Sequence, residues 1–265
     1  MNMERDSETP LAGKVCLVTG ATSGIGSAVA EVLANRGSIV ALTGRDAVRG
    51  QHLAKQLRES GAHASFLQAE LSDRTAADSL VVATIGEFGR IDVLVNNAGI
   101  LINGTALETS DETWQQTLDV NLTAAFRLCR AVLPIMIRQQ SGTIINIASD
   151  WALMGARRAL AYSVSKAALA QLTRCLALDH APAGIRVNAV CPGDTDTPML
   201  QRESEWASAE SADASHVPDK SGLAIPLGRV ARADEIARVV AFLASDESSY
   251  MTGALVAVDG GTSAQ

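Results

Sequence analysis

Seven short aliphatic runs recur along the chain, and longer helical patterns lie between most of them. The runs occupy residues 14–19, 39–43, 64–69, 91–96, 142–148, 185–190 and 254–259. The helical patterns lie near residues 25–36, 47–60, 74–88, 111–138, 160–180 and 232–244. Each run is continuously apolar rather than alternating, which is typical of strands covered on both faces. This order predicts an α/β fold with a doubly wound parallel sheet of about seven strands and helices on both faces.

We expect one domain over residues 1–265, because no repeat, linker or change of composition divides the chain. Hydrophobic residues make up 47% of the sequence but aromatic residues only 3%, so the core must be aliphatic. Pro134 falls late in the fourth helical pattern and should kink or end that helix. Residues 194–226 interrupt the alternation with a segment rich in Ser, Ala, Asp and Glu. Such an insertion predicts a mobile lid over a binding site.

Charge and cysteine usage limit the partners. The formal net charge of −7 argues against nucleic acid or an anionic membrane. The four cysteines lack metal-ligand spacing, which indicates buried thiols in a reducing compartment and no metal site. The N-terminal residues are polar and acidic, unlike a signal peptide, and no apolar stretch is expected to reach the length of a membrane span. The sequence therefore predicts a cytoplasmic protein without a metal, nucleic-acid or membrane partner.

Three glycines, Gly20, Gly24 and Gly26, separate the first strand from the first helix. Glycines allow a tight turn and a close approach of a pyrophosphate, which the N–H groups of the helix start can then bind. The spacing is GxxxGxG rather than the more common GxGxxG, so an ordinary glycine turn is the alternative. Its place between a strand and a helix favours nucleotide binding.

Tyr162 and Lys166 lie four residues apart in a segment otherwise filled with small and aliphatic residues. On a helix this spacing places both side chains on one face. A phenol is a weak acid, with a pKa of about 10, and a nearby ammonium should lower that pKa. The pair is thus suited to donating a proton to a carbonyl oxygen, or to removing one from an alcohol, without a metal.

Several motifs follow one another along the chain: "TGATSGIG", "NNAG" at 96–99, "DVNLT" around Asn121, Ser149, "YSVSK", "PGDTDTP" at 192–198 and "TGALVAVDGG" at 252–261. In this order, over Leu11 to Gly261, the sequence resembles the short-chain dehydrogenases/reductases, which are NAD(P)-dependent oxidoreductases with a Rossmann-like sheet. The resemblance implies that the glycine turn holds the cofactor pyrophosphate and that "NNAG" borders the adenosine ribose. It implies the cofactor-binding residues Gly20, Ser23, Gly24, Ile25, Gly26, Arg45, Glu70, Leu71, Asn97, Ala98, Gly99, Tyr162, Lys166, Pro192, Gly193, Thr195 and Thr197, the two threonines holding the nicotinamide carboxamide.

The resemblance also implies a catalytic tetrad, Asn121, Ser149, Tyr162 and Lys166. Ser149 would hydrogen-bond the substrate oxygen beside Tyr162. Lys166 would bond the nicotinamide ribose, and Asn121 would hold a water that relays protons through Lys166. Each residue also has a structural alternative: a core aromatic for Tyr162, a snorkelling lysine for Lys166, a strand-end cap for Ser149 and a helix-kink partner for Asn121. All four together in this motif order favour catalysis.

The sequence therefore predicts an oxidoreductase that interconverts a secondary alcohol and a ketone, with Tyr162 as the general acid and base. A catalytically silent dinucleotide-binding sensor or scaffold is one alternative, and a dehydratase or epimerase on the same fold is another. The resemblance also implies a homotetramer of paired dimers.

Side chains around the tetrad indicate a mostly apolar small-molecule substrate, such as a cyclic or aromatic one. The expected lining is Asp150, Trp151, Leu153, Met154, Ile100, Leu101, Ile102, Met199, Leu200 and Trp206. Arg157 and Arg158 could meet a carboxylate, although surface or interface positions are favoured for them.

The tip of the second strand, "ALTGRD", bears on the choice of cofactor. An NAD-specific site usually has a carboxylate there for the ribose hydroxyls, but Gly44 occupies that position. Arg45 follows and can bind a 2′-phosphate, whereas Asp46 should cap the next helix. Ser23 stands where many NADP-specific relatives have a basic residue, and Glu70 replaces the aspartate usually found near the adenine. We therefore favour NADP(H), with NAD(H) as the alternative.

Overall fold

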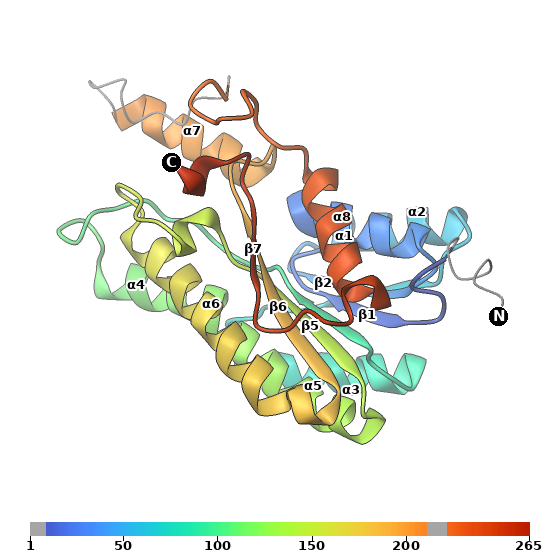
Figure 1. The fold of residues 1–265 in the computed structure, drawn as a ribbon. Coiled ribbons are helices and arrows are strands. Elements are labelled where there is room, and N and C mark those ends of the chain that lie inside the picture. Colours follow the sequence, from blue (N-terminus) through green and yellow to red (C-terminus); the bar gives the residue numbers. More distant parts are fainter. Residues whose placement is uncertain (1–8, 211–221) are drawn as a thin grey trace.

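Each of the seven aliphatic runs overlaps one strand in the computed structural model, which describes residues 9–210 and 222–265. The strands are β1 (Val15–Val18), β2 (Ile39–Gly44), β3 (Ala64–Gln68), β4 (Val93–Asn96), β5 (Gly142–Ile147), β6 (Ile185–Pro192) and β7 (Leu255–Val258). They pair in parallel as one sheet with the order β3-β2-β1-β4-β5-β6-β7 (Figure 1). The predicted fold class is confirmed.

Helices cover both faces of this sheet (Figure 1). One face carries α1 (Gly24–Asn35), α2 (Ala47–Glu59) and α8 (Ala233–Ala244). The other carries α3 (Ala76–Phe88), α5 (Ala124–Gln139) and α6 (Leu160–His180). Because the strands are covered on both sides, they need no alternation of polar and apolar residues.

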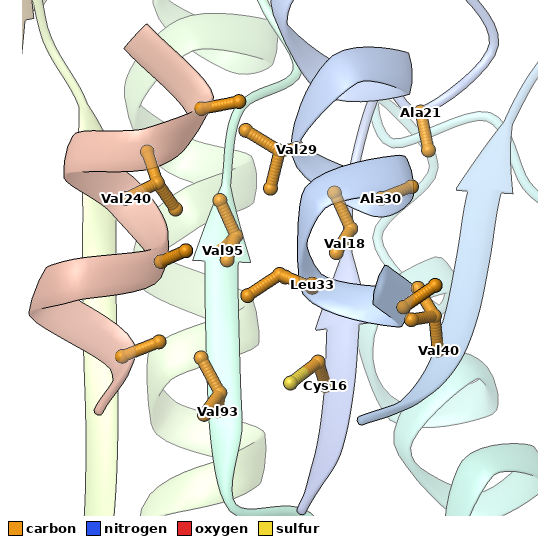
Figure 2. Close-up of a cluster of buried hydrophobic side chains, with 14 of the residues drawn as sticks. Cys16, Val18, Ala21, Val29, Ala30, Leu33, Val40, Val93, Val95 and Val240 are labelled. Atoms are coloured by element: carbon orange, nitrogen blue, oxygen red, sulfur yellow. The ribbon is translucent and has the colours of Figure 1, made fainter. Parts of the chain in front are cut away.

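The core between α1, α8 and the sheet is built from small aliphatic side chains, as the composition requires. Figure 2 shows Val29 and Leu33 of α1 and Val240 of α8 over Val18 of β1 and Val95 of β4. All five are fully buried. Short branched side chains let helix and sheet approach closely, and this close packing fixes where α1 begins relative to β1.

The helix predicted over 111–138 consists of two helices joined by a wider turn. A π-helical segment, Asp119–Thr123, separates α4 (Asp111–Leu118) from α5 and contains Asn121. Pro134 does not end α5, which continues to Gln139. Insertions of this π type are frequent at functional sites.

The combined stretch Asp111–Gln139 is long and apolar enough to cross a membrane, judged by length and composition alone. The expectation that no stretch reaches this length is therefore wrong. In the fold, Leu128, Val132 and Met136 of this stretch are buried in the core beneath the sheet. The core helix of a soluble protein passes the same test of length and composition.

The segment predicted as a lid begins with an ordered helix, α7 (Pro198–Glu210). The loop before α7 is tied back to the chain by a parallel bridge between Thr195 and Ala231. Residues 211–221, which hold much of the predicted lid, lie outside the described residues. The mobility of the lid stays a prediction.

The centre of the sheet is the place where a ligand site is expected. β1 and β4 are neighbours there, although β2 and β3 separate them in the sequence. Loops leaving the carboxyl ends of β1 and β4 therefore turn to opposite sides of the sheet. In doubly wound folds a crevice opens between such loops and holds the ligand.

Candidate active site

A cavity of about 650 Å³ lies at the carboxyl ends of the strands. It extends from the glycine turn and the tip of β2, past β4 and β5, to α6 and the start of α7. Every residue predicted to bind the cofactor or to act in catalysis lines this cavity, except Gly26 and Asn121. The fold thus brings together residues from widely separated parts of the chain.

The glycine turn is shaped for the close approach of a ligand. Gly20 has a φ of 63°, and a Cβ there would lie 2.8 Å from the Cα atom of Ala98. Gly24 begins α1 with a φ of 57°, and Ser23 makes no side-chain cap there. The first N–H groups of α1 therefore lack a side-chain acceptor at the wall of the cavity, which suits the pyrophosphate of a dinucleotide.

Gly26 and Asn97 support this turn from behind. A Cβ on Gly26 would lie 2.2 Å from the carbonyl oxygen of Gly20, so only glycine fits without a shift. The Asn97 side chain donates to the carbonyl oxygens of Thr19 (2.9 Å) and Gly20 (3.2 Å). Thr19 Oγ1 accepts from the backbone N–H groups of Asn97 and Ala98. These bonds fix the end of β4 against the glycine turn.

Tyr162 and Lys166 share one face of α6, as their spacing predicts. Both side chains are buried, and Lys166 Nζ lies 5.6 Å from the centre of the Tyr162 ring. Lys166 Nζ also donates to the carbonyl oxygen of Ile147 at the end of β5, at 2.7 Å. That bond holds the ammonium against the sheet, within the same cavity as the phenol.

The expected lowering of the pKa of Tyr162 by Lys166 is not found. Burial raises the pKa of Tyr162 above its ordinary value, the hydrogen bond with Ser149 lowers it, and the charges of Asp150 and Glu203 raise it further. Burial also lowers the pKa of Lys166 to about 8. In the protein by itself the desolvation of the phenol dominates, so Tyr162 is protonated at neutral pH.

Asn121 acts from behind the cavity. It is 1% exposed, and its side chain accepts from the Ile100 N–H (2.8 Å) and donates to the Ile100 carbonyl oxygen (2.9 Å) and to Ser165 Oγ (3.0 Å). These bonds join the π-helical segment to the loop after β4 and to α6. The Asn121 amide is thus committed to protein groups, and a proton relay through water stays a prediction.

Acidic side chains gather at the substrate end of the cavity, which the sequence did not indicate. Asp150, Asp194 and Glu203 line it together with Trp151. Burial raises the pKa of Asp150 to about 6 and that of Glu203 to about 7, and it also raises the pKa of Asp194. The three acidic residues come from separate segments, so sequence spacing could not reveal the cluster. The "PGDTDTP" motif did, however, place Asp194 next to Thr195.

The remaining predicted lining residues divide into two groups. Ile100, Leu101, Met199 and Leu200 line the cavity, whereas Ile102, Leu153, Met154, Arg157 and Arg158 do not. The Trp206 side chain is not among the described ones. Arg158 pairs with Glu108 at 2.9 Å, away from the cavity.

The adenosine end of the cavity carries Arg45 and Glu70. The Arg45 guanidinium lies 3.7 Å from the Glu70 carboxylate, and both are half-exposed or more. Asp46 caps α2 by accepting from the Arg49 N–H at 3.0 Å, as predicted. A Cβ on Gly44 would lie 2.6 Å from Thr22 Cγ2, so Thr22 occupies the space that a carboxylate side chain would need.

Comparisons with known proteins agree with this geometry. A family model described as enoyl-(acyl carrier protein) reductase matches residues 20–263. An uncharacterized oxidoreductase of Thermotoga maritima is 39% identical over 252 residues, which cover 95% of this chain and 98% of the relative. A 3-oxoacyl-[acyl-carrier-protein] reductase of the same organism is 37% identical over 251 residues, covering 95% and 98%. The crystal structure of an actinorhodin polyketide ketoreductase variant with NADPH superimposes with a TM-score of 0.89 at 34% identity, covering 96% of this chain and 98% of the other.

Proposed function

This chain belongs to the short-chain dehydrogenase/reductase family of NAD(P)-dependent oxidoreductases, and from that membership we propose that it interconverts a secondary alcohol and a ketone with Tyr162 as the general acid and base. The observation that carries the proposal is the meeting of Tyr162, Ser149 and Lys166 in the cavity that also contains the glycine turn. The named relatives that reduce oxoacyl groups and polyketide ketones support it.

The cavity fits a dinucleotide at the glycine turn, where added Cβ atoms would collide with the backbone. Bound there, the cofactor supplies or accepts the hydride. The glycine turn and the start of α1 bind its pyrophosphate, and Thr195 and Thr197 hold its carboxamide. In reduction, Tyr162 donates its phenolic proton to the carbonyl oxygen, while Ser149 holds that oxygen in place. In oxidation, the same groups act in reverse.

A panel of ketones tests the proposal against its two alternatives. Consumption of reduced cofactor with at least one ketone, and recovery of the matching alcohol, would support it. A silent sensor or scaffold would bind the cofactor without consuming it. A dehydratase or epimerase would convert its substrate with no net change in cofactor absorbance, and that outcome would refute the proposed reaction.

The cofactor we propose is NADP(H), with NAD(H) as the alternative. Support comes from Arg45 at the cavity wall, from the lack of a carboxylate at Gly44 and from the NADPH in the similar ketoreductase. Glu70 orients the guanidinium of Arg45 but adds a negative charge beside the expected phosphate. The net preference therefore depends on Arg45.

Arg45→Ala should lower kcat/KM for NADPH about tenfold, the effect of losing one hydrogen bond to a charged group. The value for NADH should stay nearly the same, since NADH has no 2′-phosphate. Steady-state kinetics with both cofactors measure this change. Lys55→Ala is the matched control, because it removes an exposed cation paired with Glu59 outside the cavity. A wild type that prefers NADH, and does so equally after Arg45→Ala, would contradict the assignment.

We also propose a homotetramer, supported by apolar surface on the outer helices and the sheet edge. Phe126 of α5 and Val164 and Leu178 of α6 are exposed by 44%, 40% and 80%. Among the described residues, β7 is the last strand of the sheet and pairs only with β6. Sedimentation should show a tetramer at micromolar concentration, and Leu178→Glu should weaken it by placing a charge in an interface. A wild-type monomer would contradict the proposal.

A cytoplasmic location and a small, partly apolar substrate complete the proposal. All four cysteines are free thiols, which suits a reducing compartment. Ile100, Leu101, Met199 and Leu200 provide the apolar part of the lining. The carboxyl groups of Asp150, Asp194 and Glu203 in the same lining disfavour an anionic substrate.

A further inference from the structure

Ser149 shares its hydrogen bonds with the residue that follows it. Its Oγ donates to Asp150 Oδ1 at 2.9 Å. The backbone N–H of Trp151 points at both groups, 3.1 Å from Ser149 Oγ and 2.8 Å from Asp150 Oδ1. Asp150 is 5% exposed and lines the cavity beside Tyr162. The hydroxyl that should meet the substrate oxygen is therefore bonded to a buried carboxyl group.

A serine hydroxyl has one proton and two lone pairs, and an ionised carboxylate can only accept. When Asp150 is ionised, the Ser149 proton is committed to it. One Ser149 lone pair accepts from the Trp151 N–H, and the other is left for the Tyr162 hydroxyl, which is also hydrogen-bonded with Ser149. In this state Ser149 offers no donor to the oxygen of a ketone.

When Asp150 is protonated, it can donate to Ser149 Oγ instead. Both Ser149 lone pairs are then filled, by Asp150 and by the Trp151 N–H, and the Ser149 proton is free to point at the substrate. In this state Ser149 and Tyr162 both donate to a carbonyl oxygen. The protonated state thus suits the ketone, whereas in the ionised state Ser149 offers it no donor.

We infer that Asp150 is a positioning residue that sets the direction of the Ser149 hydrogen bond, and so favours ketone binding when protonated and disfavours it when ionised. The inference rests on the proposed alcohol–ketone reaction. Asp150 acts on the substrate oxygen through Ser149. Trp151 assists, because its N–H fixes Ser149 and its ring packs edge-on against Tyr162, with centroids 5.7 Å apart.

The surroundings of Asp150 allow it to change its charge near neutral pH. Burial raises its pKa to about 6, the bonds from Ser149 and the Trp151 N–H lower it, and Asp194 and Asp259 raise it. The titratable groups around it come from several elements: Asp194 after β6, Asp259 after β7, Glu203 in α7, Cys191 in β6, and Tyr162 and Lys166 in α6. Asp194, Asp259 and Glu203 are acidic, and none of them stabilises the ionised form of Asp150. The pKa of Asp150 therefore stays above its ordinary value.

Ketone reduction should become slower as pH rises. Above a pH of about 6, Asp150 loses its own proton, and its carboxylate then accepts the hydrogen bond of the Ser149 hydroxyl. The value of kcat/KM for ketone reduction should then fall about tenfold, the effect of one lost hydrogen bond to the substrate.

The first test compares pH profiles of reduction. Asp150→Asn cannot titrate, so the fall near pH 6 should disappear, and Asp150→Ser provides a second non-titrating variant should the first fail to fold. Glu203→Gln is the matched control, because it removes the other carboxyl of raised pKa in the cavity. The fall should persist in Glu203→Gln. A fall that persists in Asp150→Asn, or that is lost in Glu203→Gln, would overturn the inference.

The second test needs no substrate. Infrared difference spectra against pH follow the C=O stretch of the protonated Asp150 carboxyl, identified by its loss in either non-titrating variant. Because the bond from Ser149 lowers the pKa of Asp150, Ser149→Ala should move the titration to higher pH. If no ketone is turned over, the proposed function fails, but this spectrum still shows whether the hydrogen bond from Ser149 affects the titration of Asp150. A titration of Asp150 that Ser149→Ala leaves unmoved would refute the inference.

Discussion

Tyr162→Phe should lower kcat/KM for ketone reduction by about 100- to 10,000-fold, the range that a single general acid contributes. The variant loses only the phenolic oxygen, which is the proton donor to the carbonyl oxygen. The Phe ring can fill the same buried space against Trp151. Cofactor affinity should therefore stay nearly unchanged, since the glycine turn and Lys166 are untouched.

The control for this change is the second tyrosine of the chain, Tyr250, which is fully exposed and lies outside the cavity. Tyr250→Phe should behave as wild type in both measurements. Single-turnover kinetics and a fluorescence titration with the reduced cofactor separate chemistry from binding. If Tyr162→Phe kept a tenth of the wild-type rate, Tyr162 would not be the general acid.

The fold could be predicted from the sequence because its main signal is local. Strands buried on both faces are read as unbroken aliphatic runs such as "VCLV" and "IVALT", and glycines mark the turn after the first of them. The π-helical segment around Asn121 could not be predicted in this way. A π-helix differs from an α-helix only in which backbone groups its hydrogen bonds join. The side-chain pattern does not reveal this, because residues 111–138 carry one continuous helical pattern.

The site was predictable to the extent that its residues occur in motifs. The spacing of Tyr162 and Lys166 gives their common face, and the motif order gives Ser149. The electrostatics were not predictable, because burial is a property of the folded chain. The pKa of Tyr162 is raised rather than lowered, and Asp150, Asp194 and Glu203 meet only after β5, β6 and α7 have packed together.

Lys166→Met should lower kcat/KM by about 100-fold or more, since the variant loses the cation beside the catalytic phenol. It should also weaken cofactor binding about tenfold, because the proposed hydrogen bond to the ribose is lost. Lys14→Met, just before β1 and so at the amino end of the strands, is the control and should change neither. Unchanged cofactor affinity in Lys166→Met would refute the ribose contact.

The same variant should be more stable than the wild type. Burial lowers the pKa of Lys166 from 10.5 to about 8, so folding carries a penalty for the charged form at neutral pH. Removing the charge should recover about 3 kcal/mol, and losing the bond to the Ile147 carbonyl oxygen should cost about 2 kcal/mol. The free energy of unfolding should thus rise by about 1 kcal/mol at pH 7.

The pH dependence of this gain identifies its cause. Below about pH 8 the wild-type lysine is charged in both the folded and the unfolded chain, so the penalty and the gain from Lys166→Met are fully present. Between pH 8 and 10.5 the folded lysine is neutral while the unfolded one still binds a proton. Wild-type stability therefore rises relative to the variant, and the gain shrinks. Urea unfolding of both proteins at pH 7 and pH 9.5 measures the difference. A gain that is equal at both pH values would come from packing, and it would show that the Lys166 charge carries no folding penalty.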